Sequence, residues 1–234
     1  MAEYIAQIPN SEETLLLGEM NHRINSELTC VICSVSVKAM QSDSVEVKTA
    51  LLEVVELLHQ CADVNRALRM PERGTLTDAA KYLQKLCFSI TRYRMDQPTM
   101  GVLVSADDLR LEAERCWRLG LIVSELLTNV ARHAKFDGRP PELRVDLVLA
   151  GAIVRCRVAD NGTASEPVRR GRGLTIVGEL ASSLGGRIHM SRTAEGSYAL
   201  LTFPLSEAEQ RVSGATVTVH SKRRKLRRAA VAGI

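Results

Sequence analysis

The chain is organised around Leu119-Gly-Leu-Ile-Val-Ser-Glu-Leu-Leu-Thr-Asn-Val-Ala-Arg-His-Ala-Lys135. Leucine, isoleucine and valine recur here at spacings of three and four, which predicts a helix with one apolar face. Glu125, Asn129 and His133 are spaced by four, so the helix carries them in one polar row. Because asparagine has a poor propensity for the middle of a helix, this row indicates either a solvated face or a binding site.

Two glycine motifs follow this helix in the sequence. Asp160-Asn-Gly162 comes after a segment that predicts a strand, and Gly171-Arg-Gly-Leu174 precedes a segment that predicts a helix. Glycines ahead of a helix suit a phosphate group held by the N-terminal amides. Each motif alone is a weak signal, since Asp-Asn-Gly is also a common turn. Their order behind a polar helix row favours a site for a metal ion and a polyphosphate.

The N-terminal part predicts two long amphipathic helices joined by a short turn. The first runs to about Gln41 and the second covers about residues 45–69. One hairpin cannot bury the apolar stripes of both helices, so we expect a dimer that forms a four-helix bundle. His22 is two residues from Met20 and therefore points away from the first stripe. That stripe comprises Leu16, Met20, Ile24, Leu28, Ile32, Val35 and Ala39.

The following part mixes helices and strands, which predicts an α/β sandwich. The fold class is therefore α+β, with a helical hairpin in residues 14–70, a hinge at residues 70–74 and the sandwich in residues 75–206. The expected elements of the sandwich cover residues 77–92 (helix), 100–104 (strand), 112–134 (helix), 143–149 and 152–159 (hairpin), 174–184 (helix), and 187–191 and 197–204 (strand pair).

Composition excludes several classes of protein. No uncharged apolar run reaches the roughly 18–20 residues of a membrane span, and the N-terminus lacks the basic region of a signal peptide. The six cysteines lie in apolar segments, so we expect reduced core residues in a cytoplasmic protein. Of the net charge of +4, residues 207–234 contribute +5, which leaves −1 for the rest (24 basic against 25 acidic residues). This balance argues against a nucleic-acid-binding body and predicts a mobile basic tail in residues 207–234.

Taken together, the motifs resemble the ATP-binding domain of histidine kinases and their relatives, the GHKL superfamily. Residues 121–135 are similar to its N-box, and the two glycine motifs are similar to its glycine boxes. The hairpin resembles the dimerisation and histidine-phosphotransfer domain of the HisKA-2/HWE subclass, in which the phosphorylated histidine precedes an arginine, as His22 precedes Arg23. The resemblance covers about residues 14–206.

The chain departs from this family in several places. Asn25, Ser26 and Glu27 stand where the subclass usually has Lys-Asn-Asn. No Phe-containing box lies between the glycine motifs, and the lid segment, residues 163–170, is short. Trp117 does not occupy the position that gives the HWE group its tryptophan. These departures concern the rate and regulation of autophosphorylation more than the fold.

The resemblance implies binding of ATP with Mg²⁺. Asn129 would coordinate Mg²⁺ and Glu125 would orient a metal-bound water, which suits the preference of Mg²⁺ for few protein oxygens. Asp160 would accept a hydrogen bond from the adenine amino group, and Gly162 would let the backbone approach the base. The expected phosphate contacts are Gly171, Gly173 and Leu174, with the side chains of Arg132, His133, Lys135, Arg170 and Arg172.

His22 would be the nucleophile, a neutral imidazole that attacks the γ-phosphoryl group in line. Arg23 fills the place of the acid that follows the histidine in the larger kinase group. Glu19, or Glu125 of the second chain of a dimer, is therefore a candidate base.

The expected function is a dimeric, sensorless two-component histidine kinase. It would autophosphorylate from Mg·ATP and pass the phosphoryl group to an aspartate in the receiver domain of a response regulator. Two alternatives stay open: a phosphotransferase that relays phosphate between regulators without ATP, and a non-catalytic ATP-binding scaffold that sequesters a regulator. Intact ATP motifs favour the kinase over the relay, whereas the altered segment Asn25-Ser26-Glu27 and the short lid keep the scaffold open.

Overall fold

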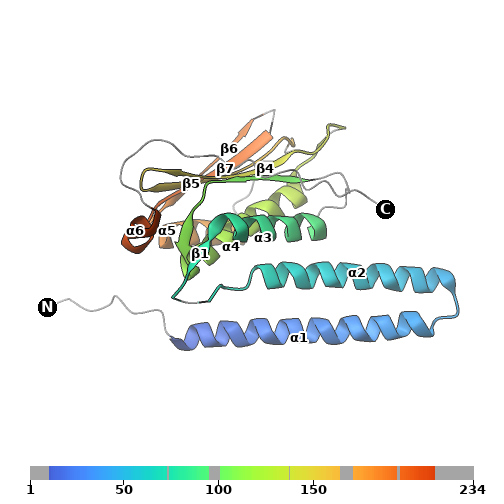
Figure 1. The fold of residues 1–234 in the computed structure, drawn as a ribbon. Helices are drawn as coiled ribbons and strands as arrows, with labels where there is room; N and C mark the ends of the chain where they lie inside the picture. The colour runs from blue at the N-terminus through green and yellow to red at the C-terminus, as the bar shows by residue number, and fades with distance from the viewer. Residues whose placement is uncertain are drawn as a thin grey trace. The chain divides into compact units, whose positions relative to one another are not determined.

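The structure is a computed structural model that describes residues 11–72, 74–94, 101–136, 138–163, 171–193 and 196–213 (Figure 1). The chain divides into two compact units, Met1–Arg69 and Met70–Ile234, and each is described by itself. In the described parts of both units, no helix is long and apolar enough to cross a membrane.

The first unit is a hairpin of α1 (Ser11–Gln41) and α2 (Val45–Ala67), which pack along each other. Ser44 is the N-cap of α2, because its hydroxyl accepts a hydrogen bond from the Val47 amide at 3.2 Å. The cap ends the short turn and starts the return helix. The predicted helical hairpin is therefore confirmed.

The apolar stripe predicted for α1 does not lie on one face. Leu16, Met20 and Ile24 are 59%, 58% and 42% exposed, whereas the later members of the stripe are half-buried or buried. A step of four residues overshoots a full turn by about 40°, so a run of such steps rotates away from the buried face. Half-buried Asn21 and Asn25 continue that face toward the N-terminus instead.

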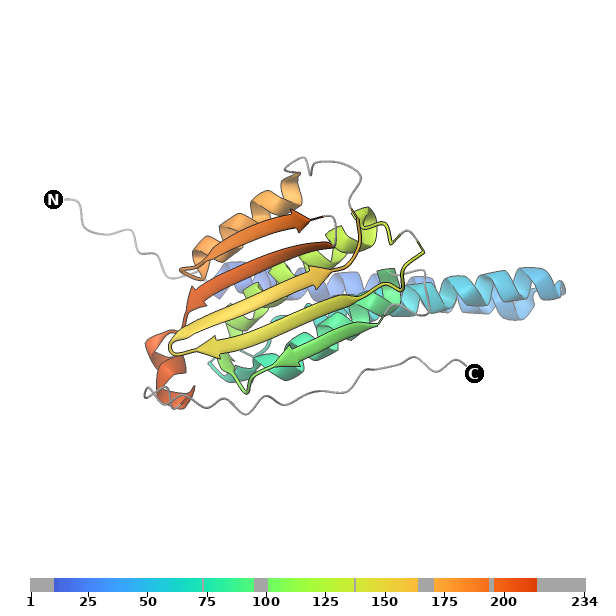
Figure 2. The same cartoon turned by 90° about the horizontal axis from the view of Figure 1, so that it is seen from above.

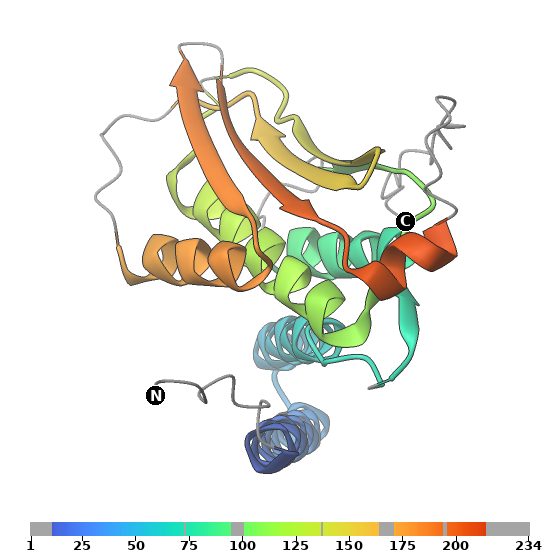
Figure 3. The same cartoon turned by 90° about the vertical axis from the view of Figure 1, so that its left-hand side faces the viewer.

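The second unit is a five-stranded sheet covered on one face by helices (Figures 2 and 3). The strand order is β2-β4-β5-β7-β6; β2 runs parallel to β4, and the other pairs are antiparallel. A separate ribbon pairs β1 with β3, which the sequence does not predict. The elements are β1 (Leu76–Asp78), α3 (Ala79–Arg94), β2 (Val102–Ala106), β3 (Arg110–Glu112), α4 (Ala113–His133), β4 (Leu143–Ala150), β5 (Ile153–Asp160), α5 (Arg172–Ser183), β6 (Arg187–Thr193), β7 (Gly196–Pro204) and α6 (Glu207–Ser213).

The core of the second unit lies between the sheet and helices α3, α4 and α5. Alternate residues of the strands are buried on the helix side, and their neighbours face away from the helices. Fully buried members of this core include Leu83, Leu86, Ile90, Leu119, Ile122, Leu127, Leu147 and Phe203. Helix α4, which carries the polar row, is thus held by apolar contacts along its opposite side. The fold confirms the predicted α+β class.

Helix α6 is held by a buried ion pair. The carboxylate of Glu209 is fully buried and accepts hydrogen bonds from Arg115 Nε at 3.0 Å and from the amides of Glu112 (2.9 Å) and Ser206 (2.8 Å). The Arg115 guanidinium also donates to the carbonyls of Leu184 and Pro204. Residues 207–213 were expected in a mobile tail and instead form this docked helix; residues 214–234 lie outside the described residues.

The cysteines do not all belong to a core. Cys30 and Cys33 are exposed on α1, and Cys61 is half-buried. Cys87, Cys116 and Cys156 are buried, and burial raises the pKa of Cys116 and of Cys156 to about 12. All six are free thiols, and the expected core position is wrong for Cys30 and Cys33. Helix α1 turns these two away from its buried face.

Candidate functional site

The second half of α4 presents the polar row to one side of the helix. Glu125 and Asn129 are half-buried, whereas His133 at the end of the helix is exposed. The amide nitrogen of Asn129 is buried and has no hydrogen-bond partner among the described residues. Buried amides are almost always paired, so this side chain has binding capacity that the surrounding chain leaves unused.

The second glycine motif lies against this row. A Cβ atom added to Gly173 would be 2.0 Å from Oε1 of Glu125, which is closer than any atoms pack. Glycine lets the start of α5 approach the Glu125 carboxylate, and a larger residue would force this flexible side chain to turn away. Gly171 precedes the helix without a side-chain cap, while Gly171 and Arg172 are exposed and Leu174 is half-buried. The first amides of α5 are therefore free of side-chain caps.

Asp160 lies at the end of β5 and is held from two sides. Its Oδ1 accepts from the Gly162 amide at 2.9 Å, and its Oδ2 accepts from the hydroxyl of Ser197 on β7. Burial raises the pKa of Asp160 above its usual value, while the two hydrogen bonds and the charge of Arg192 oppose that rise. The carboxylate is thus fixed in orientation at the edge of the core.

The first glycine motif and the end of α4 are joined through the backbone. Lys135 and Thr163 exchange amide-to-carbonyl hydrogen bonds of 2.9 and 2.7 Å. Gly162 is buried in this corner, where an added Cβ would be 2.8 Å from Cβ of Ala134. The motif that carries Asp160 is therefore tied to the helix that carries Asn129.

The sequence does not reveal two residues of this corner. Ser197 orients Asp160, and it could be found only by knowing that β7 pairs with β5 in the register Asp160 to Ser197. Asn161 accepts from the Glu142 amide at 2.8 Å and donates to the Pro140 carbonyl at 2.9 Å. The Asn161 side chain therefore holds the turn in place. In the sequence, the Asp-Asn-Gly turn pattern is the one signal that could have predicted this role.

The basic residues of the candidate site lie around it as exposed side chains. Arg132, His133, Lys135 and Arg172 are exposed, and none of them forms an ion pair with another described residue. Arg170 lies outside the described residues. No group of three or more His, Cys, Asp or Glu side chains among the described residues could hold a metal ion. A metal ion would need other ligands in addition to Glu125 and Asn129.

The residues proposed for phosphotransfer belong to the other unit. His22, Arg23 and Glu19 are exposed on α1. On the neighbouring turn Asn25 donates to the Asn21 carbonyl at 2.8 Å, and its Oδ1 is buried without a partner in the described chain. The helix thus keeps the imidazole of His22 accessible to solvent.

Two family models match the chain in the order of the two units. The histidine kinase model HisKA_2 matches residues 19–93, and the model of the histidine kinase-like ATPase domain, HATPase_c_2, matches residues 99–202. The HisKA_2 match includes His22 and continues past the first unit into β1 and α3 of the second. The HATPase_c_2 match lies within the second unit and includes Asn129 and both glycine motifs.

The chain is also similar to light-regulated kinases of Erythrobacter litoralis. It is 25% identical over 201 residues to blue-light-activated histidine kinase 2 of strain HTCC2594, which covers 82% of this chain and 57% of that protein. The solved histidine kinase domain of the EL346 blue-light-activated histidine kinase matches with a TM-score of 0.55 and 20% identity, over 79% of this chain and 98% of that one. The EL346 protein itself matches with a TM-score of 0.52 and 20% identity, over 82% and 61% of the two chains.

The chain spans little more than half the length of the curated relative. The solved structures support the fold, and the two family models, in the same order and over most of the chain, support the family. The chain therefore belongs to the histidine kinases, in the HisKA-2/HWE-type subclass, with a phosphotransfer-type hairpin ahead of a histidine kinase-like ATPase domain.

Proposed function

We propose that this chain is a protein-histidine kinase that binds Mg·ATP, phosphorylates His22 and passes the phosphoryl group to an aspartate in the receiver domain of a response regulator. The observation that carries the proposal is the unused buried amide of Asn129, in the same polar row as the Glu125 carboxylate that packs against Gly173. In a histidine kinase-like ATPase domain, these are the groups expected to meet a metal-bound triphosphate.

The polar row suits a magnesium ion that is bound mainly through its other ligands. Mg²⁺ takes few protein oxygens and keeps water and phosphate ligands, so the amide oxygen of Asn129 would coordinate it and Glu125 would orient a bound water. The unpaired amide nitrogen of Asn129 would donate a hydrogen bond to a phosphate oxygen. When bound, the ion neutralises charge on the transferring phosphoryl group. The exposed cations Arg132, His133, Lys135 and Arg172 and the uncapped amides of α5 would bind the phosphates.

The corner around Asp160 suits the base of the nucleotide. The Asp160 carboxylate is oriented by Ser197 and by the Gly162 amide, and it would accept a hydrogen bond from the adenine amino group. A Cβ atom added to Gly162 would be 3.1 Å from Oδ1 of Asp160, so glycine keeps a side chain away from this carboxylate. This assigns base recognition to one carboxylate in a fixed orientation.

His22 would act as the nucleophile. Its neutral imidazole nitrogen forms a bond to the γ-phosphorus while the bond to the β,γ-bridging oxygen breaks, and ADP leaves. Its proton passes to a base, for which Glu19 on the preceding turn and Glu125 of a second chain are the candidates. Arg23 would bind the phosphoryl oxygens beside His22.

A homodimer forms part of this proposal. Leu16, Met20 and Ile24 of α1 are exposed beside the buried face of the hairpin. On α2, Val54 and Leu57 are 43% and 53% exposed. A second hairpin would cover these side chains in a four-helix bundle.

The test is incubation of the purified full chain with γ-labelled ATP and Mg²⁺, beside His22→Ala, Asn129→Ala and the control His59→Ala. His59 is also an exposed histidine of the hairpin. We expect acid-labile, alkali-stable label on the unchanged chain and on His59→Ala, and none on the other two variants. Nucleotide binding without label would point to the scaffold. If neither binding nor label is seen, the relay becomes the better function, and a phosphorylated receiver domain should then label His22.

A further inference from the structure

The sheet face opposite the helices carries a row of polar side chains that the kinase proposal does not use. The strand registers place Ser105, Asp146, Arg157, Leu200 and His189 side by side across β2, β4, β5, β7 and β6. Arg155 lies two residues from Arg157 on the same face of β5. No described helix covers this face (Figure 3). It is thus separate from the nucleotide corner on the helix side.

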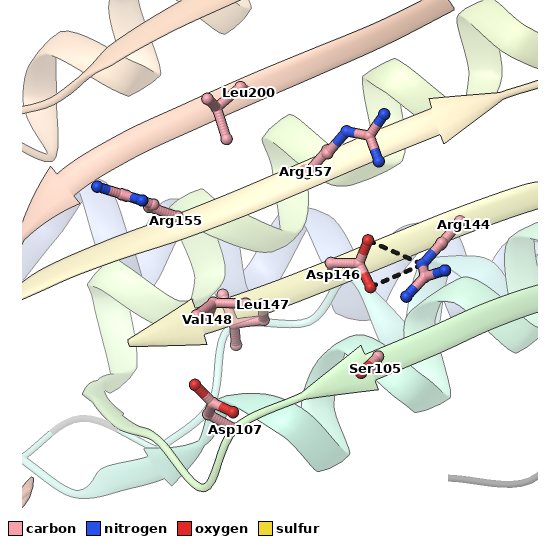
Figure 4. A pocket seen from close by; sticks show the side chains of 9 residues that line it. All are labelled: Ser105, Asp107, Arg144, Asp146, Leu147, Val148, Arg155, Arg157 and Leu200. Carbon is pink, nitrogen blue, oxygen red and sulfur yellow. Dashed lines mark hydrogen bonds and ion pairs between the residues drawn. The ribbon is translucent and has the colours of Figure 1, made fainter. Parts of the chain in front are cut away.

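A pocket of about 300 Å³ opens on this face (Figure 4). Arginines at three positions line it, two aspartates lie beside them, and the aliphatic side chains of Val148 and Leu200 are half-buried in its lining. The charged members of the lining are Asp107, Arg144, Asp146, Arg155 and Arg157.

The acidic and basic side chains of the pocket differ in how far they are already paired within the chain. Arg144 Nε donates to both oxygens of Asp146 at 2.9 Å (Figure 4). Buried Asp107 accepts from the Leu149 amide at 2.9 Å. Arg155 and Arg157 are exposed, and neither forms an ion pair with any residue that the structure describes. Both aspartates of the pocket therefore accept hydrogen bonds from within the chain, whereas Arg155 and Arg157 have no ion-pair partner among the described residues.

The position of Arg157 is partly fixed before any ligand binds. Its guanidinium lies 5.1 Å from the centroid of the Tyr198 ring, which is half-buried on β7. A guanidinium stacked on an aromatic ring keeps the edge that donates hydrogen bonds free for a carboxylate. Holding one partner in advance reduces the entropy lost on binding.

We propose that this pocket binds an acidic, extended segment of a partner protein. Arg155 and Arg157 are two residues apart on one strand, so their Cα atoms are about 6.8 Å apart, which matches alternate side chains of an extended peptide. Two carboxylates would pair with the arginines, and an apolar side chain would contact Leu200 and Val148. Two arginines without an ion pair among the described residues match two carboxylates better than a continuous phosphate backbone, and the basic end of this chain has the wrong sign of charge.

The first test uses a short fluorescent peptide of alternating glutamate and valine, with binding to the full chain measured by anisotropy. Arg155→Gln/Arg157→Gln should weaken binding about tenfold, because two charge-assisted pairs are lost. Two matched controls each remove two positive charges: Arg110→Gln/Arg139→Gln, exposed elsewhere in the unit, and Arg223→Gln/Arg224→Gln in the basic end. Both controls should change affinity less than about twofold.

A second measurement reverses the charges. Arg155→Glu/Arg157→Glu should lose affinity for the acidic peptide and gain affinity for a peptide of alternating lysine and valine. An unfolded variant would not gain this second affinity. Equal loss in the tail variant would show that the basic end binds the peptide and would overturn the proposal. Tighter binding of a thymidine oligonucleotide through Arg155 and Arg157 would overturn it in favour of nucleic acid.

Discussion

The two ends of α4 hold buried polar side chains in opposite ways. Near the start, Arg115 donates to Glu209, Leu184 and Pro204, and the Glu209 carboxylate accepts from the guanidinium of Arg115 and from two backbone amides. Near the end, Asn129 has a buried amide without a partner in the described chain. A satisfied network stabilises the fold, whereas an unsatisfied group lowers stability until a ligand binds it. The comparison separates the stabilising end of the helix from the end that we propose binds the nucleotide.

The largest expected effect comes from breaking the satisfied end. Glu209→Ala leaves Arg115, whose side chain is 16% exposed, without its carboxylate. Removing one partner of a buried ion pair typically lowers the free energy of unfolding by about 3–5 kcal/mol. Urea denaturation would measure the change. The control is Glu207→Ala on the same helix, where the partner atoms are 3.7 Å apart and the glutamate is 93% exposed. A loss of similar size in both variants would contradict the assigned role.

The next effect concerns the unsatisfied end. Asn129→Ala should change the free energy of unfolding without nucleotide by less than about 1 kcal/mol, because the amide nitrogen has no partner to lose. It should abolish the stabilisation by Mg·ATP, which for a binding-competent protein reaches about 2.7 kcal/mol at a hundredfold excess over Kd. Urea denaturation with and without Mg·ATP measures both. Ser124→Ala, on the same helix, should keep the nucleotide effect. A large loss of stability without nucleotide would mean that Asn129 supports the fold.

A smaller effect is expected where the glycine motif meets α4. Gly173→Ala would place a methyl group 2.0 Å from Oε1 of Glu125, so this flexible carboxylate must turn away. We expect nucleotide affinity to fall about tenfold, which is about 1.4 kcal/mol, with little change in folding stability. Gly178→Ala is the matched control, since an added Cβ there meets nothing within 4 Å. That control should raise helix stability by about 0.5–1 kcal/mol and leave affinity unchanged.

The smallest effect depends on pH. Burial raises the pKa of Asp160, so the folded state holds this proton more tightly than the unfolded state. Its ionised form therefore destabilises the fold at pH values above the folded-state pKa. Asp160→Asn should be more stable than the unchanged chain at pH 7, and this advantage should shrink as pH falls through that pKa. Thermal unfolding across pH measures the difference. Nucleotide binding should nevertheless be lost.

Ser197→Ala sharpens this last prediction. It removes a hydrogen bond that lowers the pKa of Asp160, so the same pH dependence should move to higher pH. An unchanged profile would show that Ser197 does not control the carboxylate.

Local patterns in the sequence were sufficient to predict the helices, most of the strands and the polar row of α4. Apolar spacing is a local property, so the long helix later seen as Ala113–His133 and the β4–β5 hairpin are readable from the sequence. The prediction that the apolar stripe of α1 lies on one face was wrong. Residues spaced by four advance about 40° around the helix at each step, and this rotation exposes Leu16, Met20 and Ile24.

By itself, the sequence determined which chemical groups this protein carries: Glu125 and Asn129 in one helical row, the two glycine motifs, and the pair His22-Arg23. Only the tertiary structure decided which of them meet. It brings Ser197 to Asp160 through strand pairing, Gly173 to Glu125 through helix packing, and Glu209 to Arg115 through a helix that was expected to be a tail. These contacts join segments far apart in the chain, and long-range pairing depends on packing rather than on local propensity.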